Sequence, residues 1–185
     1  MRCGALLSWV RAHVRAGVAD RRGVAAIEFA LVVPILIVVY VVGFEVADAA
    51  TVYRKLTDTT VQLANVTAQY TTMDSSDVST VMNASSQIMA PYPTTNLSIV
   101  LSEISTNSSG QATVTWSRAF QGTALAAGAL VTPPAGFQAA SSSYIMVQTS
   151  YGYTPPFGAG FMGPITMTNE IFMVPRNSSS IPFDG

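Results

Sequence analysis

The hydrophobic and polar positions of the chain follow three patterns in succession. An apolar run lies near the N-terminus, between residues 24 and 44. A stripe of apolar positions at steps of three and four then continues to about residue 70. Beyond residue 96, apolar and polar residues alternate with period two. These patterns predict a membrane-spanning helix, an amphipathic helix and a set of β-strands, in that order.

The apolar run has the length of a transmembrane helix. Val24–Phe44 is 21 residues long and contains one charged residue, Glu28, and about 20 residues suffice to cross a hydrocarbon core about 30 Å thick. Its many β-branched residues lower helix propensity in water. In lipid, however, the backbone must satisfy its own hydrogen bonds and therefore forms a helix. Pro34 removes one of these bonds, so we expect a bend there.

The helix is expected to continue beyond the membrane. No glycine or proline occurs from Glu45 to Tyr70, and a helix from about Val24 to Tyr70 would be roughly 70 Å long at a rise of 1.5 Å per residue. Its apolar positions form one face, which we expect to pack on the C-terminal part of the chain. The positions of this predicted stripe are Val52, Leu56, Thr59, Leu63, Val66 and Tyr70.

A second, shorter helix is predicted next. Asp74 or Ser75 is suited to cap its N-terminus, and Pro91 ends it. Its buried face is expected to consist of Val78, Val81, Met82, Ser85, Ile88 and Met89.

Four strands are predicted after this helix. NLSIVLSEIS and ATVTWS alternate in polarity and are joined by the turn NSSG, whereas SSSYIMVQTSYGY and ITMTNEIFMVP follow a Gly/Ala/Pro-rich loop. Antiparallel pairing is expected because no convincing crossover helix separates the strands. In the second strand, Ala112, Val114 and Trp116 should share one face. The predicted fold class is α+β, with the long helix packed on a small antiparallel sheet.

The charges are distributed unevenly along the chain. Charged residues make up 10% of it, compared with about 25% in a typical soluble domain. Five of the nine Lys and Arg residues lie in the first 22 positions, including Arg15, Arg21 and Arg22 just before the apolar run. A basic flank on this side predicts a cytoplasmic N-terminus and a C-terminal part on the other side of the membrane. The acidic remainder has no basic patch for nucleic acid.

The residue types available for chemistry argue against an enzyme. The single cysteine, Cys3, and the single histidine, His13, both lie in the basic N-terminal segment. Most nucleophilic triads and most zinc sites are therefore excluded from the folded part. A glycosidase-like pair such as Glu103 and Glu170 stays open at the level of sequence. We expect no cofactor, no metal and no small-molecule substrate.

Residues 21–34, RRGVAAIEFALVVP, resemble the N-terminus of TadE-like proteins of the tight-adherence (Tad/Flp) pilus system, a branch of the type IV pilins. In that family a basic cytoplasmic leader ends in glycine, and a hydrophobic helix with glutamate at its fifth residue follows. The resemblance implies a leader ending at Gly23, a mature N-terminus at Val24, and Glu28 as the fifth residue. It also implies a pilin-like fold. The later segments YIMVQTSYGYTPPF and FMVPR resemble the family's C-terminal strands more loosely.

The resemblance also implies a role for Glu28 and a set of partners. Cleavage after Gly23 by a prepilin peptidase would leave Val24 with an α-ammonium group, protonated near pH 7. Glu28 lies one helical turn deeper, roughly 6 Å away by helix rise, and an unpaired carboxylate there would cost on the order of 2–3 kcal/mol. Pairing with the ammonium of a neighbouring pilin subunit would offset that cost. The alternative is that Glu28 lies near the headgroups and does nothing specific.

A conventional signal peptide is the competing interpretation of the same region. Ala47-Asp48-Ala49 is an A-x-A pattern directly after the apolar run, and cleavage after Ala49 would release a soluble domain. The uncharged run Phe29–Phe44 is 16 residues long, however, which is longer than the roughly 7–15 residues usual in signal peptides. The predicted stripe also continues through this position without a break.

Aromatic residues near the C-terminus have two interpretations. They form either an adhesive surface or part of the packed core, and core packing is the commoner outcome for such residues. The residues concerned are Tyr144, Tyr151, Tyr153, Phe157 and Phe161.

Together these observations predict a TadE-like pseudopilin or minor pilin of the bacterial inner membrane. Its parts would be a leader (1–23), a transmembrane helix (24–45), an amphipathic helix (46–70) and a periplasmic α+β head (71–185). The expected function is assembly of a pilus used in surface adhesion. The expected partners are a prepilin peptidase, other pilin subunits through helix packing, and the membrane, but not nucleic acid.

Overall fold

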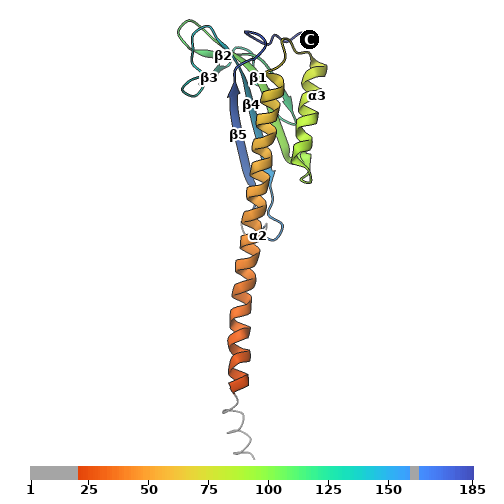
Figure 1. The fold of residues 1–185 in the computed structure, drawn as a ribbon, viewed down its shortest axis with the longest axis vertical. Helices are drawn as coiled ribbons and strands as arrows, with labels where there is room; N and C mark the ends of the chain where they lie inside the picture. The colour runs from red at the N-terminus through yellow and green to blue at the C-terminus, as the bar shows by residue number, and fades with distance from the viewer. Residues whose placement is uncertain (1–20, 159–162) are drawn as a thin grey trace, which may run out of the picture. The chain divides into compact units, whose positions relative to one another are not determined.

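The computed structural model describes residues 21–158 and 163–185. Its longest element is the helix α2 (Arg21–Thr67), which contains both the apolar run and most of the predicted stripe (Figure 1). The chain divides into two compact units between Phe44 and Glu45. Residues 45–185 are called the head below.

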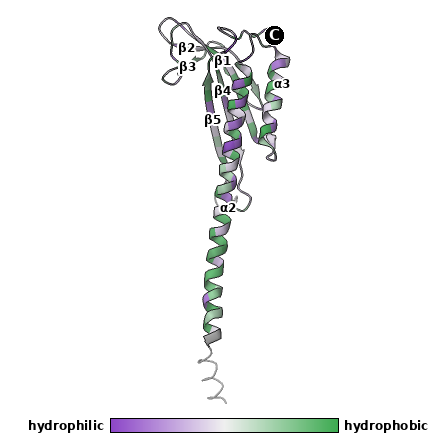
Figure 2. Cartoon of the chain, in the orientation of Figure 1, coloured by the Kyte–Doolittle hydropathy of each residue, from purple (hydrophilic) through white to green (hydrophobic). Residues whose placement is uncertain are grey.

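The part of α2 that precedes the head has an apolar, exposed surface. Its side chains include Phe29, 71% exposed, and Tyr40, 75% exposed, and the corresponding residues are mostly green in Figure 2. Pro34 lies inside the helix without ending it. Within the described part of the chain, α2 is the one helix that is long and apolar enough to cross a membrane. Length and composition therefore agree with the predicted membrane-spanning segment.

The described residues of the head form one five-stranded sheet in the order β3-β2-β1-β4-β5. Every pair of neighbouring strands is antiparallel, which confirms the predicted α+β class and the pairing. The short strand β3 comes from the Gly/Ala/Pro-rich loop and was not predicted. The strands are β1 (Leu97–Thr106), β2 (Ala112–Phe120), β3 (Leu130–Val131), β4 (Ser143–Tyr153) and β5 (Ile165–Met173).

The predicted short helix is α3 (Ser75–Ser86), and its cap is Asp74. The Asp74 carboxylate accepts a hydrogen bond from the Asp77 N–H at 2.7 Å, while the Asp77 carboxylate accepts one from the Asp74 N–H at 3.3 Å. This reciprocal capping box satisfies two backbone donors that the first turn of a helix leaves unpaired. Two short 3-10 helices, Gln87–Met89 and Thr94–Asn96, connect α3 to β1.

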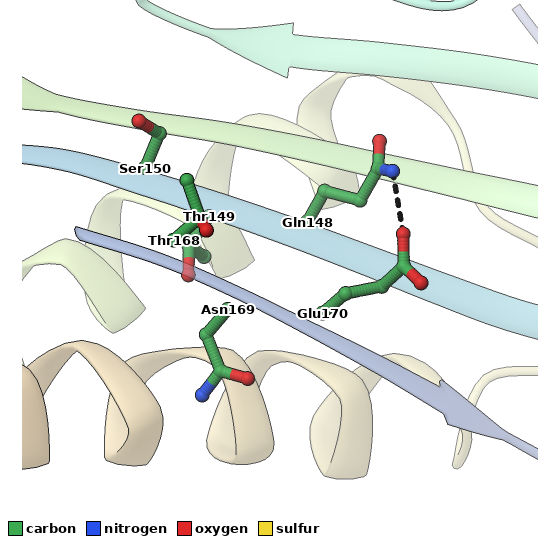
Figure 3. Close-up of a pocket in the computed structure, with 6 residues that line it drawn as sticks. All are labelled: Gln148, Thr149, Ser150, Thr168, Asn169 and Glu170. Atoms are coloured by element: carbon green, nitrogen blue, oxygen red, sulfur yellow. Dashed lines mark hydrogen bonds between the residues drawn. The ribbon is translucent and has the colours of Figure 1, made fainter. Parts of the chain in front are cut away.

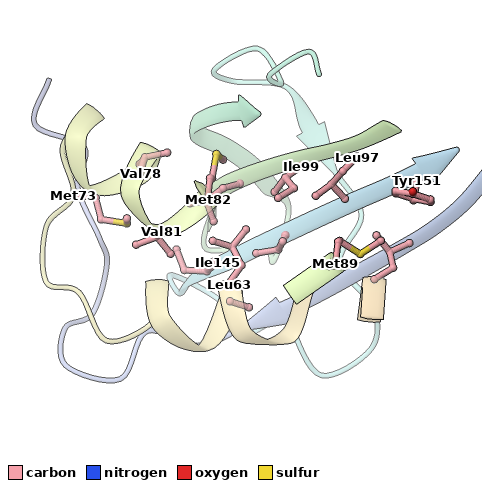
Figure 4. Packing of buried hydrophobic residues seen from close by; sticks show 14 of the residues in the cluster. Leu63, Met73, Val78, Val81, Met82, Met89, Leu97, Ile99, Ile145 and Tyr151 are labelled. Atoms are coloured by element: carbon pink, nitrogen blue, oxygen red, sulfur yellow. The ribbon is translucent and has the colours of Figure 1, made fainter. Parts of the chain in front are cut away.

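Both helices of the head pack on one face of the sheet and form the main core (Figure 4). A buried polar contact joins α2 to the sheet here, because Thr60 Oγ1 lies 2.7 Å from Thr149 Oγ1 of β4. The fully buried apolar side chains of this core include Val52, Leu56 and Leu63 from α2, Met73 and Met89 around α3, and Leu97, Ile99, Leu101, Ile145 and Val147 from the sheet. The prediction that α2 packs on the sheet is thus confirmed.

A smaller core lies on the opposite face of the sheet. Residues from the connection between β2 and β4 cover it, among them Phe137, whose ring lies edge-on to Tyr144 with 5.4 Å between ring centroids. Its buried members are Ile104, Ala112, Val114, Tyr144, Met146 and Phe172.

A β-bulge interrupts the alternation that was predicted for the second strand, β2. The register places Glu103 opposite Trp116 but Ile104 opposite Val114, so that Thr115 is an extra residue. An extra residue reverses the faces of all residues beyond it. Trp116 therefore lies in the main core while Val114 lies in the smaller one, and the prediction that they share a face was wrong.

Two further members of the predicted stripe, Val66 and Tyr70, lie elsewhere than predicted at the end of α2. Val66 is 38% exposed, whereas Ala64 and Thr67 are fully buried. Residues follow one another at about 100° around a helix, so Thr67 lies closer than Val66 to the direction of Leu63. Tyr70 lies beyond the helix, which ends at Thr67, and packs against the core while partly buried.

The last segment of the chain is hydrogen-bonded to the residues that directly follow α2. The Arg176 N–H donates to the Ala68 carbonyl at 2.8 Å, and Asn177 Nδ2 donates to the Gln69 carbonyl at 2.7 Å. Both carbonyl groups lie just beyond the helix, whose own last carbonyl groups accept hydrogen bonds from the N–H groups of residues 68–70. Tertiary hydrogen bonds therefore hold the chain directly after the helix, and sequence periodicity does not reveal them.

Candidate assembly segment and the carboxylates of the head

The proposed cleavage site lies in the first turn of α2. Gly23 and Val24 are the third and fourth residues of the helix as the structure describes it. A side chain built on Gly23 would meet no described atom within 4 Å, so the backbone there is open to approach. Arg21 and Arg22 begin the same helix, whereas Arg15 lies outside the described residues.

Glu28 is an exposed carboxylate in an exposed apolar surface. Its neighbours include Val24, Ile27 and Phe29, which are 54%, 63% and 71% exposed respectively. One turn of helix separates Val24 from Glu28, which is about 6 Å of rise. A surface of this kind requires lipid or other helices around it, because monomeric soluble proteins rarely expose such large apolar patches. A lone carboxylate within it favours a cationic partner.

The head begins with a second carboxylate, Glu45, which is 5% exposed. Its Oε1 accepts hydrogen bonds from two consecutive backbone N–H groups, those of Phe157, at 2.8 Å, and Gly158. A Cβ at residue 158 would lie 2.5 Å from Glu45 Oε2, so any larger residue would require the Glu45 carboxylate to move. Glu45 thus attaches the loop after β4 to the first turn of the head helix.

Asp48, one turn further along α2, accepts hydrogen bonds from two tyrosines. Tyr92 Oη donates to Asp48 Oδ1 at 2.5 Å and Tyr153 Oη donates to Oδ2 at 2.8 Å. The hydrogen bond to Asp48, followed by burial, raises the pKa of Tyr92 to about 12. Burial, followed by the hydrogen bond to Asp48, also raises the pKa of Tyr153. Both phenols therefore remain protonated donors across the physiological range.

A third carboxylate, Glu103, is 2% exposed and lies at the β-bulge. Glu103 Oε1 accepts hydrogen bonds from Ser143 Oγ at 2.6 Å and from the Ile181 N–H at 2.8 Å. The Ile181 carbonyl in turn accepts a hydrogen bond from Trp116 Nε1 at 2.7 Å. Glu103 therefore holds the C-terminal segment in the main core and has a structural role.

The carboxylate pair considered from sequence is not brought together. Glu103 lies opposite Ile145, on the face that packs against the helices. Glu170 lies opposite Gln148, on the other face, and accepts a hydrogen bond from Gln148 Nε2 at 2.6 Å (Figure 3). The sheet separates the two side chains, so they cannot act on one glycosidic bond.

The aromatic residues divide between core and surface. Tyr144, Tyr151 and Tyr153 are at most 4% exposed, which confirms the interpretation as packed residues. Phe157 is 66% exposed, and Phe161 lies outside the described residues. Among the described residues of this set, packing in the core is thus the commoner outcome.

Sequence reasoning missed Glu45 and Asp48 as structural anchors. The stripe was defined by apolar positions, and Asp48 was considered only as part of a cleavage pattern. The spacing did contain one signal. Glu45 lies seven residues and Asp48 four residues before Val52, so both lie on the same helix face as the predicted stripe. Their partners, Phe157, Gly158, Tyr92 and Tyr153, are distant in sequence and could not be identified.

Comparison with known proteins identifies one segment. Residues 23–65 match the family model described as TadE-like protein. The match begins at Gly23 and includes Glu28, Glu45, Asp48 and most of the predicted stripe, so it confirms the resemblance found at the N-terminus. The looser C-terminal resemblance lies outside the matched residues. No match was found among curated proteins or among solved structures.

Proposed function

We propose that this protein is a TadE-like pseudopilin or minor pilin that helps to assemble a Tad (Flp) pilus used in surface adhesion. The observation that carries the proposal is the apolar, exposed start of α2, with Glu28 five residues after Gly23, inside the segment that matches the TadE-like family. The role is structural, and the protein is the substrate of an enzyme, a prepilin peptidase, rather than an enzyme itself.

In this proposal the N-terminal part of α2 has two environments in turn. It first spans the inner membrane, with the basic leader in the cytoplasm and the head in the periplasm. It then leaves the lipid for a bundle of pilin helices, where apolar side chains such as Ile27 and Phe29 pack against neighbouring subunits. Both environments are apolar, so the transfer involves little change in hydrophobic free energy.

Cleavage after Gly23 would create the partner for Glu28. The new α-ammonium group of Val24 and the Glu28 carboxylate are one turn apart on each subunit, so each has an opposite charge available on a neighbour. An unpaired carboxylate costs on the order of 2–3 kcal/mol in this environment. Only one axial register removes that cost, and Glu28 would therefore set the register between adjacent subunits.

The contacts of the head argue against a conventional signal peptide. Cleavage after Ala49 would remove Glu45 and Asp48, and with them the acceptors for the Phe157, Gly158, Tyr92 and Tyr153 donors. It would also divide an unbroken helix. Ala49 itself packs against the main core. These features support retention of the whole helix after processing.

The N-terminal residue of the protein in the membrane fraction tests the proposal. Intact mass and peptide mapping should show a start at Val24 in cells that contain a prepilin peptidase, and a start at Met1 when the peptidase is inactivated. A start at Ala50 would mean ordinary secretion and would overturn the pilus function. A start at Met1 in cells with an active peptidase would leave a plain membrane protein.

Glu28 tests the assembly step separately. Glu28→Gln keeps the size of the side chain but removes its charge, so we expect fewer assembled pili or loss of processing. Val32→Ala, one turn further along the exposed helix, is the matched control and should leave both intact. Normal processing together with normal pilus number in Glu28→Gln would show that Glu28 has no specific role.

A further inference from the structure

A small hollow lies on the surface of the head, between α3 and the end of β2. The apolar side chains of Val78, Met82 and Phe120 line it, and the exposed residues Ser79 and Asn83 lie at its rim. Its volume is about 190 Å³, whereas sites for small-molecule ligands usually measure about 300–1,000 Å³. The hollow is therefore better suited to one side chain of another protein than to a free ligand.

The hollow also contains a guanidinium group that forms no ion pair with a described carboxylate. Arg118 Nη1 donates to the Ser117 carbonyl at 2.9 Å, and the guanidinium carbon lies 3.9 Å from the centroid of the Phe183 ring. Its other N–H groups have no hydrogen-bond partner among the described residues. Stacking on the ring holds the planar group in place. Arg118 thus presents fixed donors that suit a carboxylate, because the two groups pair through parallel hydrogen bonds.

Most carboxylates of the head already have partners in the described part of the chain. Of the remaining two, Asp184 lies on the side of the hollow itself, because its N–H is bonded to the Met73 carbonyl just before α3. Asp58 is exposed on α2 and has no hydrogen bond or ion pair with a described residue. Asp58 is thus the carboxylate that the head leaves available for a neighbour. The six of the eight that accept hydrogen bonds are Glu45, Asp48, Asp74, Asp77, Glu103 and Glu170.

Asp58 and Arg118 lie at different heights in the head. Thr60 contacts Thr149, which is level with Phe120 across the sheet. Asp58 precedes Thr60 by two residues of helix, about 3 Å, and Arg118 precedes Phe120 by two residues of strand, about 7 Å. Since α2 and β2 run in opposite directions, these distances add to about 10 Å. Two heads of the same orientation therefore bring Asp58 of one to Arg118 of the other only when they are offset along α2.

We infer that the hollow at Arg118 receives the Asp58 carboxylate of a second copy of this chain, and that this contact joins the heads of neighbouring subunits. The contact rests on the proposed pilus function, in which neighbouring copies have the same orientation. Donor and acceptor lie on different elements and at different heights, so the contact is heterologous. Each copy gives its Asp58 to one neighbour and its Arg118 to another. The heads thereby fix the offset between successive copies.

Cross-linking between two differently tagged copies of the full chain tests this contact. With Cys3→Ser as background, one copy carries Gln62→Cys and the other Ser79→Cys, and membranes from cells that produce both are treated with a short bismaleimide. Gln62 is exposed one turn after Asp58, and Ser79 lies at the rim of the hollow, so the charged pair is kept. We expect a cross-linked dimer that carries both tags. Ser108→Cys, exposed in the turn between β1 and β2, replaces Ser79→Cys in the matched control and should not give this dimer.

A charge exchange identifies the two partners. Arg118→Glu in the Ser79→Cys copy should abolish the doubly tagged dimer, because it places two carboxylates together. Asp58→Arg in the Gln62→Cys copy should abolish it as well, whereas the two changes together should restore it. Restoration distinguishes a lost contact from a head that Arg118→Glu has unfolded. Asp184→Asn in the Ser79→Cys copy should leave the dimer unchanged.

Absence of the doubly tagged dimer, or a dimer that survives Arg118→Glu, overturns the contact. So does a dimer that is lost in both single variants and does not return when they are combined. A dimer that is lost in Asp184→Asn but not in Asp58→Arg assigns the carboxylate to Asp184 and overturns the pair with Asp58. The N-terminal residue separates this result from the proposed function. A start at Val24 without the dimer removes only the contact, whereas a start at Ala50 with the dimer removes the pilus function.

Discussion

Three carboxylates of the head, Glu45, Asp48 and Glu103, are bound by neutral donors in the described part of the chain. Their partners are backbone N–H groups and the hydroxyls of Ser143 and two tyrosines. Hydrogen bonds to charged groups contribute more than those between neutral groups, about 1.5–3 kcal/mol each. Each carboxylate joins segments that are far apart in sequence, so removing one should loosen a specific connection.

Glu103→Ala should destabilise the head by about 3 kcal/mol, because the Ile181 N–H and the Ser143 hydroxyl would lose their buried acceptor. Urea unfolding followed by circular dichroism measures the change. Glu170→Ala is the matched control: it removes a carboxylate from the exposed face and should change stability by less than about 0.5 kcal/mol. Equal effects of the two substitutions would contradict the role assigned to Glu103.

The Asp48 contacts predict that the head loses stability in strong alkali. The pKa of Tyr92 is raised from about 10 in the unfolded chain to about 12 in the fold, so the folded state favours the protonated phenol. This contribution is complete below pH 10 and is lost as the pH rises toward 12. The loss should be about 1 kcal/mol, which is less than the shift alone would give at about 1.4 kcal/mol per pKa unit, because Tyr92 is only partly buried and solvent screens the interaction.

The measurement is the free energy of unfolding in urea at several pH values between 8 and 12. Asp48→Asn should show a smaller decrease over this range, because the largest cause of the raised pKa of Tyr92 has been removed. Parallel pH dependences for the original protein and Asp48→Asn would mean that other groups cause the decrease.

At the scale of elements, the two successive parts of α2 differ in which of their side chains are buried. Before Glu45 it is exposed and apolar, and within the head it has one buried stripe. The corrected stripe consists of Val52, Leu56, Thr59, Thr60, Leu63, Ala64 and Thr67. Small and hydroxylated residues in this set allow the helix to approach the sheet closely, as the contact between Thr60 and Thr149 shows.

Two positions three residues apart on α2 test this stripe. Leu63→Ala should destabilise the head by about 2–5 kcal/mol, the usual range for a fully buried leucine, whereas Val66→Ala should change stability by less than about 1 kcal/mol because Val66 is 38% exposed. Thermal and urea unfolding of both variants measure the two changes in the free energy of unfolding. A larger effect of Val66→Ala would restore the stripe as first predicted.

The elements that could be predicted are those with a local cause. The length of the apolar run, the Asp74 cap and the alternation of four strands each depend on neighbouring residues alone. The bulge at Thr115 depends on how β1 pairs with β2, and the two-residue strand β3 exists only because β2 is beside it. Tertiary pairing decided these features, so the sequence contains no periodic signal for them.

At the scale of the whole molecule, the first residues of the head contribute to its stability as the core does. A chain that begins at Ala50 lacks Glu45 and Asp48, whereas one that begins at Glu45 retains both. Four hydrogen bonds to carboxylates separate the two, so the shorter chain should be less stable by at least about 3 kcal/mol. Comparison of their thermal unfolding measures this difference, and equal midpoints would weaken the case against cleavage after Ala49.

The resemblance to the TadE-like family was easier to recognise from the sequence than the contacts of the head. Gly23, Glu28 and the flanking charges stand close together in sequence, so their pattern could be read directly. The hydrogen bond from the Phe157 N–H to Glu45 joins residues 112 positions apart, and the bond from the Arg176 N–H to the Ala68 carbonyl joins residues separated by most of the head. Only the folded structure brings such residues together.

The position of Ile181 in the main core has a consequence for how the protein is made. Ile181 is fully buried, and its backbone is bonded to Glu103 and Trp116. Translation and export deliver α2 first and this segment about 110 residues later. Until then the stripe of α2 has no complete partner, so the newborn chain exposes this apolar face until its C-terminal segment has been delivered. Substitution of Ile181 by a polar residue should therefore lower the abundance of the protein in the cell, which quantitative immunoblotting of the total protein measures.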